Sequence, residues 1–140
     1  MIYCDTSLLV AALVPEPETE SVQRWLEQQA ADQLATSDWG LTEFSSAIAL
    51  KARRGDIPAD RKSDVLTQWQ IMVAERLILL PVPASAFALA ARYCEMSASS
   101  LRAEDALHIA VASLGGHGLA TLDAAMAEAA GSVGVRVIGV

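Results

Sequence analysis

Cysteine is nearly absent from the sequence, which has two in 140 residues. Cys4 and Cys94 lie far apart and match no zinc-site or redox spacing, and two cysteines cannot supply a disulfide framework. We expect both to be reduced, small and buried. No run of about 18 apolar residues occurs, so the sequence predicts no membrane-spanning helix. The N-terminus has an acid at Asp5 and no basic region, which argues against a signal peptide and predicts a cytoplasmic protein.

Positive charge is scarce as well. Ten Lys and Arg residues against 17 Asp and Glu residues give a formal net charge of -7. This balance disfavours a non-specific nucleic-acid binder, which usually carries a basic excess. It does not exclude an enzyme in which a metal ion neutralises clustered carboxylates. With 53% hydrophobic and 19% charged residues the chain is too apolar to be disordered, and residues 1–140 are expected to form a single domain.

Several motifs of other α/β enzymes are missing. No Walker loop, G-x-G-x-x-G or G-x-S-x-G pattern occurs, and the glycines of residues 115–118 lack the required spacing. A haloacid-dehalogenase-like phosphatase would carry an aspartate where Ser7 stands. A receiver domain would carry an acid pair beside the first strand, where Asp5 stands alone. The sequence therefore argues against these classes.

Apolar segments that favour strands alternate with segments that favour helices. We expect strands at residues 2–4, 33–37, 77–82, 118–123 and 133–140, and helices at 8–13, 18–30, 39–54, 58–76, 84–96, 105–112 and 124–130. The run at 77–82 predicts a buried strand. This alternation predicts an α/β fold, a central parallel sheet of four to five strands with helices on both faces. Ligands of such sheets bind beyond the carboxyl ends of the strands.

Four acids stand at the ends of strands or in the first turns of helices. Asp5 and Asp123 each follow an expected strand, Glu43 lies near the start of the 39–54 helix, and Asp105 begins an apolar helix. Gathered carboxylates repel one another, and a divalent cation removes that penalty. Ligands that are all oxygen select hard cations such as Mg²⁺ or Mn²⁺, which can activate water against a phosphodiester.

Each acid also has a simpler interpretation. Asp5 and Asp105 could cap helices, Glu43 could be a surface residue of its helix, and Asp123 could belong to a turn. Taken singly, these interpretations remain open. The joint placement of the four acids favours one shared site.

Four segments, in this order, resemble PIN-domain nucleases, and most of all the VapC type, the toxins of bacterial toxin–antitoxin pairs. They are residues 1–7 with D-T-S, the pair Thr42-Glu43, residues 101–110 with R-A-x-D-A-L-H-x-A, and residues 120–123 with T-x-D. The resemblance covers nearly the whole chain. It implies a PIN fold and a metal-dependent endoribonuclease in which Asp5, Glu43, Asp105 and Asp123 hold Mg²⁺ or Mn²⁺. It further implies that Thr6 or Ser7 assists by hydrogen bonding and that Thr121 orients Asp123 or a water.

The same resemblance implies a homodimer and a cognate antitoxin that also binds promoter DNA. A basic antitoxin would suit the acidic charge of this chain. One feature departs from many members of the family, which carry a further acid where Ala124, Ala125 and Met126 stand here. Glu104 is a possible substitute, so the resemblance leaves one or two metal ions open. The RNA target and the antitoxin class also remain open.

Basic residues that could contact RNA phosphates are few. Arg102 is the best candidate because it precedes the Asp105 helix. Lys51, Arg53 and Arg54 form a second group, although cations at a helix end also suit the helix dipole. His108 is expected to pack or hydrogen bond rather than act as a catalytic base, and His117 is expected in a loop.

Apolar helix surface predicts contacts with partners. Leu8, Leu9, Ala12 and Leu13, with the helices around Trp25 and Trp69, offer more apolar surface than a small sheet would cover, which predicts a dimer and an antitoxin groove. Two other functions remain as alternatives: a non-catalytic α/β interaction domain, and another Mg-dependent phosphoryl-transfer enzyme. Mg²⁺-dependent cleavage of RNA, but not of small phosphate esters, distinguishes the nuclease from both.

Overall fold

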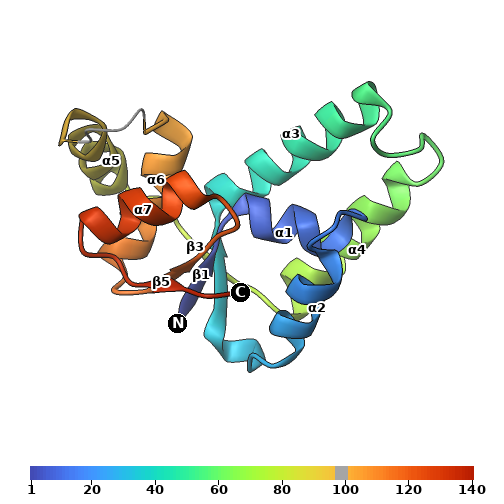
Figure 1. The fold of residues 1–140 in the computed structure, drawn as a ribbon, viewed down its shortest axis with the longest axis horizontal. Helices are drawn as coiled ribbons and strands as arrows, with labels where there is room; N and C mark the ends of the chain where they lie inside the picture. The colour runs from blue at the N-terminus through green and yellow to red at the C-terminus, as the bar shows by residue number, and fades with distance from the viewer. Residues whose placement is uncertain (97–100) are drawn as a thin grey trace.

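The computed structural model describes residues 1–96 and 101–140 and shows a parallel sheet with helices on both faces (Figure 1). The strands are β1 (Ile2–Cys4), β2 (Leu34–Ser37), β3 (Ile78–Leu80), β4 (Gly118–Ala120) and β5 (Val137–Ile138). The α-helices are α1 (Thr6–Leu13), α2 (Thr19–Glu27), α3 (Asp38–Arg54), α4 (Lys62–Glu75), α5 (Ala84–Met96), α6 (Ala103–Leu114) and α7 (Ala124–Ser132), with a 3-10 turn at Ala31–Gln33. The predicted α/β class and five parallel strands are confirmed.

The first strand of the sequence is the central strand of the sheet. The strand order is β3-β2-β1-β4-β5, and every neighbouring pair is parallel. Ile2 is in register with Leu34 of β2 on one side and with Gly118 of β4 on the other. The carboxyl ends of β1, β2 and β4 therefore lie next to one another, which is where the sequence placed its acids.

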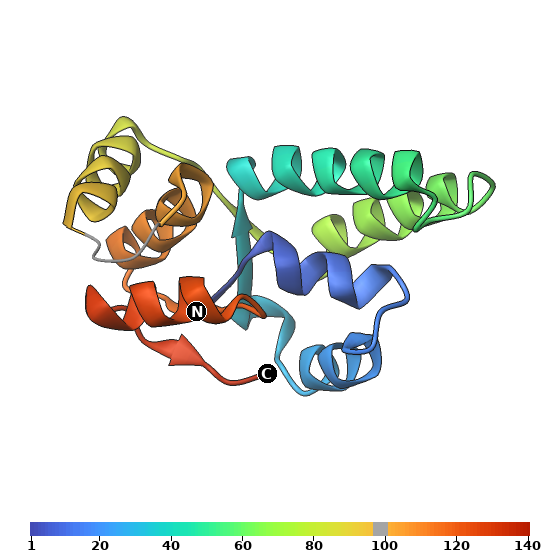
Figure 2. The ribbon, with the colours of Figure 1, turned by 45° about the horizontal axis from the view of Figure 1, so that its top comes forward.

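Two hydrophobic cores lie on opposite faces of the sheet. Side chains of a strand alternate between faces, so Cys4 packs with α1, α2, α3 and α4, whereas its neighbour Tyr3 packs with α5, α6 and α7. Figure 1 shows the two helical groups on either side of the strands, and Figure 2 shows α4 returning alongside α3. The site described below lies where elements of both groups meet.

Local signals account for most helix ends. Asp5 caps α1 by accepting from the Leu8 N–H, and Ser37 caps α3 by accepting from the Gly40 N–H. Gly55 ends α3 in the left-handed region at a φ of 80°, as expected for a glycine at that place. The predicted starts and ends of these helices are confirmed within a few residues.

Three predicted elements were wrong in extent or burial. The 77–82 run forms an edge strand, because β3 pairs with β2 alone, and Ile78 and Leu79 are 38% and 41% exposed rather than buried. Pro58 closes a turn by accepting from the Arg61 N–H, so α4 begins at Lys62. The last strand is Val137–Ile138 rather than residues 133–140, because Gly134 has a φ of 83°, outside the extended region.

Most of the apolar surface from which a dimer was predicted is internal, while Leu13 and Trp25 are half-buried. Leu8, Leu9 and Ala12 of α1 are buried, as is Trp69, because α2, α3 and α4 cover them within the same chain. Of the two cysteines, Cys4 is buried as expected and Cys94 is half-buried. None of the helices in the described ranges has the length and apolarity needed to cross a membrane.

Candidate active site

Asp5 lies where the carboxyl ends of β1 and β4 meet. Its backbone N–H donates to the Ala120 carbonyl at 3.1 Å, and the residue is 1% exposed. Its carboxylate accepts from the Leu8 N–H at 3.1 Å, from the Ser7 hydroxyl at 2.8 and 2.9 Å, and from the Thr121 hydroxyl at 2.7 Å. Burial raises the pKa of Asp5, and these hydrogen bonds partly offset that effect.

Asp123 is joined to Asp5 through Thr121. The Thr121 hydroxyl that donates to Asp5 also accepts from the Asp123 N–H at 3.0 Å. The exposed Asp123 side chain caps α7, since its Oδ1 accepts from the Met126 N–H at 2.9 Å. Capping therefore occupies one oxygen of Asp123 and does not conflict with a role in a shared site. The Thr121 hydroxyl thus lies between the Asp5 carboxylate and the Asp123 backbone.

Glu43 lies in the second turn of α3 and its side chain is 24% exposed. Its Oε2 lies 2.6 Å from Nε2 of His108, a residue of α6 that is 1% exposed. Burial raises the pKa of Glu43, but the hydrogen bond with His108 outweighs that effect, so the pKa lies below its usual value. Glu43 is therefore ionised at neutral pH.

Asp105 lies in the first turn of α6 and does not cap it, because Arg102 occupies the N-cap position. The pKa of Asp105 is raised to about 6. Burial is the largest cause, and the negative charges of Asp123, Glu104 and Glu43 add to it. Three elements, α3, α6 and the loop before α7, thus direct negative charge at one carboxyl group. This convergence supports a shared site for the acids that the sequence singled out.

The donor set fits a hard divalent cation. Within residues 1–96 and 101–140, no three Asp, Glu, His or Cys side chains converge closely enough to hold an ion as they are oriented. The Asp5 carboxylate is instead directed at the Ser7, Thr121 and Leu8 donors. The buried Thr6 hydroxyl has no hydrogen-bond partner in the described part of the chain. An all-oxygen set of mutually repelling carboxylates with an unsatisfied hydroxyl beside it matches Mg²⁺ or Mn²⁺.

The two residues after Asp5 differ in what they contact. Ser7 hydrogen bonds both carboxylate oxygens of Asp5 and also accepts from the Leu122 N–H at 3.2 Å. Thr6 is 7% exposed and makes no such contact with Asp5. Ser7 is therefore the residue that organises Asp5.

A cavity of about 600 Å³ opens beside Glu43, between α3, α5 and α6. Trp39 and Phe87 supply its aromatic walls, and Glu43 and Glu104 supply its charged groups. Phe87 is 57% exposed. The sequence did not predict this cavity, because α5 and α6 are brought against α3 by the tertiary fold.

The basic residues divide into two groups. Arg102 is exposed at the start of α6, three residues before Asp105. Lys51, Arg53 and Arg54 lie in the last turn of α3, at least about 12 Å along the helix from Glu43 at 1.5 Å per residue. Lys51 is also engaged in an ion pair with Glu16. The structure thus brings Arg102, and not the Lys51 group, to the edge of the site.

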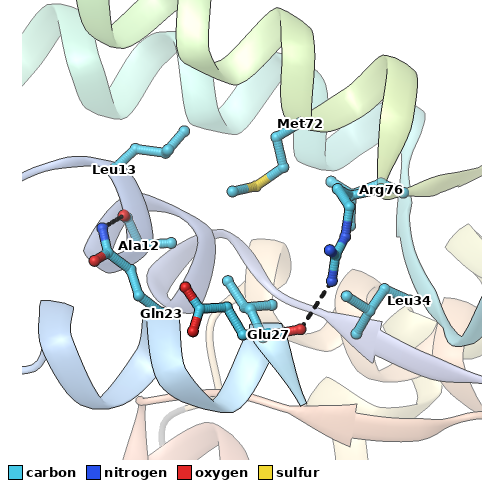
Figure 3. A pocket seen from close by; sticks show the side chains of 9 residues that line it. Ala12, Leu13, Gln23, Glu27, Leu34, Met72 and Arg76 are labelled. Carbon is cyan, nitrogen blue, oxygen red and sulfur yellow. Dashed lines mark hydrogen bonds between the residues drawn. The ribbon is translucent and has the colours of Figure 1, made fainter. Parts of the chain in front are cut away.

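A second cavity of about 220 Å³ lies away from the acids, between α1, α2 and α4 (Figure 3). Two of its polar side chains already have partners: Gln23 donates to the Ala12 carbonyl at 2.8 Å, and Arg76 donates to the Leu26 carbonyl at 2.9 Å. These contacts satisfy carbonyls near the ends of α1 and α2. We therefore assign this cavity to the packing of the helices.

Tyr3 and Ser37 are the polar residues near the site that sequence analysis did not single out. Both are fully buried, and the Tyr3 hydroxyl lies 2.7 Å from Ser37 Oγ and 2.8 Å from His108 Nδ1. The available signal was Tyr3, the polar member of an otherwise apolar strand of three residues. A buried phenol hydroxyl needs a hydrogen-bond partner, so the sequence indicated that one exists. The partner itself lies 105 positions away and leaves no local pattern.

A family model described as the PIN domain matches residues 2–132. Ribonuclease VapC47 of Mycobacterium tuberculosis is 31% identical over 114 residues, which cover 80% of this chain and 74% of that protein. Ribonuclease VapC3 of Pyrobaculum aerophilum is 32% identical over 129 residues, which cover 91% of this chain and 92% of that protein. Among solved structures, VapBC2 of Rickettsia felis, bound to a DNA fragment from its promoter, is similar with a TM-score of 0.69 at 15% identity, covering 99% of this chain and 98% of that chain.

An α/β sheet with acids at the carboxyl ends of its strands, matched by this family model over most of its length, defines a PIN domain. The chain belongs to the PIN-domain family, and within it to the VapC-type toxins that the sequence resemblance indicated.

Proposed function

We propose that this VapC-type endoribonuclease hydrolyses RNA phosphodiester bonds with a divalent cation, Mg²⁺ or Mn²⁺, held by Asp5, Glu43, Asp105 and Asp123. The observation that carries this proposal is geometric: Asp5 and Asp123, joined through the Thr121 hydroxyl, lie at the carboxyl ends of β1 and β4, and the negative charges of Asp123, Glu104 and Glu43 act together on Asp105. Such an arrangement destabilises a protein unless a cation or a proton neutralises it. The curated relatives are named as ribonucleases, which supports RNA as the substrate.

The bound cation would supply water activation and stabilisation of the charge on the phosphoryl oxygen. The residues of the chain orient the ligands. Ser7, Thr121 and the Leu8 N–H hold the Asp5 carboxylate by hydrogen bonds, and Thr121 holds the backbone of Asp123. These hydrogen bonds limit the freedom of the Asp5 carboxylate and of the Asp123 backbone before substrate binds, which favours catalysis.

Substrate RNA has to approach an acidic protein. We assign Arg102 to an RNA phosphate, because it is exposed at the start of the helix that carries Asp105. Lys51 is assigned to the ion pair with Glu16 and not to RNA. Binding through few cations should depend only modestly on salt, since the salt slope follows the number of phosphate contacts.

We further propose a cognate antitoxin as the partner. The name of the VapBC2 structure describes a two-component assembly on promoter DNA. The cavity beside Glu43 combines aromatic walls with Glu43 and Glu104, which suits a partner segment with apolar and basic side chains. We place the protein in the cytoplasm, where such RNA and DNA are found. We also propose a homodimer, and a monomer by light scattering at micromolar concentration would contradict it.

The test is incubation of the purified, antitoxin-free protein with total RNA, in Mn²⁺, in Mg²⁺ and in EDTA, beside Asp105→Asn. We expect discrete fragments that require the cation and are absent with the variant. Intact RNA with a folded sample that binds Mn²⁺ would indicate another phosphoryl substrate. Intact RNA without Mn²⁺ binding would indicate an interaction domain that lacks the metal centre.

A further inference from the structure

A buried chain of hydrogen bonds runs from the start of α3 to the candidate active site. The Gly40 N–H donates to Ser37 Oγ at 3.3 Å, and Ser37 Oγ lies 2.7 Å from the Tyr3 hydroxyl. The Tyr3 hydroxyl lies 2.8 Å from Nδ1 of His108, and Nε2 of His108 lies 2.6 Å from Oε2 of Glu43. Tyr3, Ser37 and His108 are each at most 1% exposed.

The two ends of this chain define the direction of its hydrogen bonds. Ionised Glu43 can only accept, so Nε2 of His108 donates to it. In the neutral imidazole Nδ1 is then an acceptor, and it accepts from the Tyr3 hydroxyl. Burial raises the pKa of Tyr3 well above its usual value, so the phenol keeps its proton. The Tyr3 oxygen in turn accepts from the Ser37 hydroxyl. The polar side-chain atoms of Ser37, Tyr3 and His108 therefore all have hydrogen-bond partners.

The arrangement is more than a link between helices. Three buried polar side chains replace apolar packing on one face of the sheet, and each would be destabilising without its partner. The chain ends on Glu43, whose side chain is partly exposed and lines the cavity between α3, α5 and α6. Without His108 the Glu43 carboxylate would be free to rotate into this cavity.

We propose that His108 is a positioning residue for Glu43, held by Tyr3 and Ser37 in the tautomer that carries its proton on Nε2. This inference rests on the proposed function, because it concerns Glu43 as a ligand of the cation. Hydrogen bonds that orient a ligating carboxylate usually change metal affinity by roughly 10- to 100-fold when they are removed. Tyr3 and Ser37 act through His108 and contact neither substrate nor cation.

The first test is the tautomer of His108 in the metal-free protein, read from long-range ¹H–¹⁵N spectra of the imidazole rings at pH 7.5. The chain has two histidines, so His117 provides an internal reference. We expect the proton of His108 on Nε2 alone. A proton on Nδ1 alone, or on both nitrogens, would overturn the proposed direction of the hydrogen bonds through His108, whether or not the protein binds a metal.

The second test uses the two tyrosines of the chain as a matched pair. Tyr3→Phe removes the hydroxyl that bonds His108, and Tyr93→Phe removes a hydroxyl that bonds Ser113 at 3.0 Å, away from Glu43. We expect Tyr3→Phe to weaken Mn²⁺ binding several-fold by calorimetry and Tyr93→Phe to leave it unchanged. Equal Mn²⁺ affinity of both variants and the wild type would overturn the role of the hydrogen bonds from Ser37 and Tyr3 to His108.

The third test asks whether the N–H donor itself is what matters. His108→Leu fills the space without a donor and is expected to weaken Mn²⁺ binding by roughly 10-fold or more. His108→Gln keeps an N–H donor and is expected to recover most of the affinity, with thermal unfolding as the check on folding. Wild-type binding by His108→Leu would overturn only this inference. A wild-type protein that binds no Mn²⁺ would overturn the metal centre and this role of His108 together.

Discussion

The Thr121 hydroxyl donates to Oδ2 of Asp5 at 2.7 Å and connects the carboxyl ends of β1 and β4. The same oxygen accepts from the Asp123 N–H, so one side chain contacts two of the four acids. Because it links residues 116 positions apart, this contact forms only in the folded chain. The acids are thus held by the fold before any cation binds, and their mutual repulsion governs the first prediction.

Removing the charge of Asp105 should have opposite effects on activity and on stability. In EDTA at pH 7.5, Asp105→Asn is expected to unfold at a higher temperature than the wild type, because the negative charges that raise the pKa of Asp105 no longer act on it. RNA cleavage with Mn²⁺ should fall at least about 100-fold, since a ligand is lost. Differential scanning calorimetry and a cleavage assay test the pair of effects; lower stability of the variant in EDTA would contradict the repulsion.

The stability of the metal-free protein should depend on pH through the same residue. The pKa of Asp105 rises from 3.8 to about 6 on folding, so the unfolded chain loses this proton first as the pH rises. Its contribution to stability is therefore greatest below pH 3.8 and is lost as the pH rises to about 6. Between pH 4 and 7 in EDTA, the free energy of unfolding measured in urea should decline less for Asp105→Asn than for the wild type. Equal dependence on pH in the two proteins would refute the raised pKa of Asp105.

Cation binding should stabilise the folded protein. A ligand that binds the folded state alone raises the unfolding temperature with its concentration. We expect millimolar Mn²⁺ to raise the melting temperature of the wild type by several degrees and to have little effect on Asp105→Asn. An identical shift in both proteins would indicate binding elsewhere.

The two groups of basic residues should differ in their effect on RNA. Arg102→Gln is expected to weaken RNA binding. It should also reduce the slope of log binding constant against log salt concentration by about 1, which corresponds to one lost phosphate contact. Arg53→Gln, at the far end of α3, should leave both quantities unchanged. Fluorescence anisotropy with labelled RNA in EDTA, over a range of salt, measures both. Equal losses in the two variants would remove Arg102 from the site.

A glycine near the start of α3 should be sensitive to substitution. A Cβ at Gly40 would lie 2.5 Å from the Thr36 hydroxyl, which itself donates to the Cys4 carbonyl. Gly40→Ala is therefore expected to destabilise the protein by about 1–3 kcal/mol. Gly131 of α7 has open space around it, and Gly131→Ala should stabilise by roughly 0.5–1 kcal/mol. Urea unfolding of both variants tests the contrast, and equal stability of Gly40→Ala and wild type would contradict the close approach.

Features that depend on neighbours in sequence were predicted well. Asp5 caps α1 through the next few residues, as the sequence allowed, and the predicted end of the 39–54 helix matches the end of α3, which Gly55 sets by its own backbone preference. Alternation of strands and helices was enough for the parallel sheet, since that topology follows from general rules of connection. The positions of Asp5 and Asp123 at strand ends follow directly from it.

Features that depend on distant contacts were not predicted. The 77–82 run is as apolar as a central strand, but its place at the sheet edge follows from the strand order and not from its composition. The face of α1 that includes Leu8 looked unpartnered because the packing of α2, α3 and α4 over it is not visible in sequence. The link between Tyr3 and His108 spans 105 positions and was missed for the same reason.

The pairing of β1 with β4 has a consequence for the cell that makes this protein. Asp5 precedes its partner Thr121 by 116 positions, and the acid Asp123 follows Thr121 by two. During synthesis the chain must therefore extend past residue 121 before the contact that holds the Asp5 carboxylate can form. A fragment that stops before residue 121 would lack the hydroxyl that donates to Asp5, so its Asp5 carboxylate would lose one of its fixed partners.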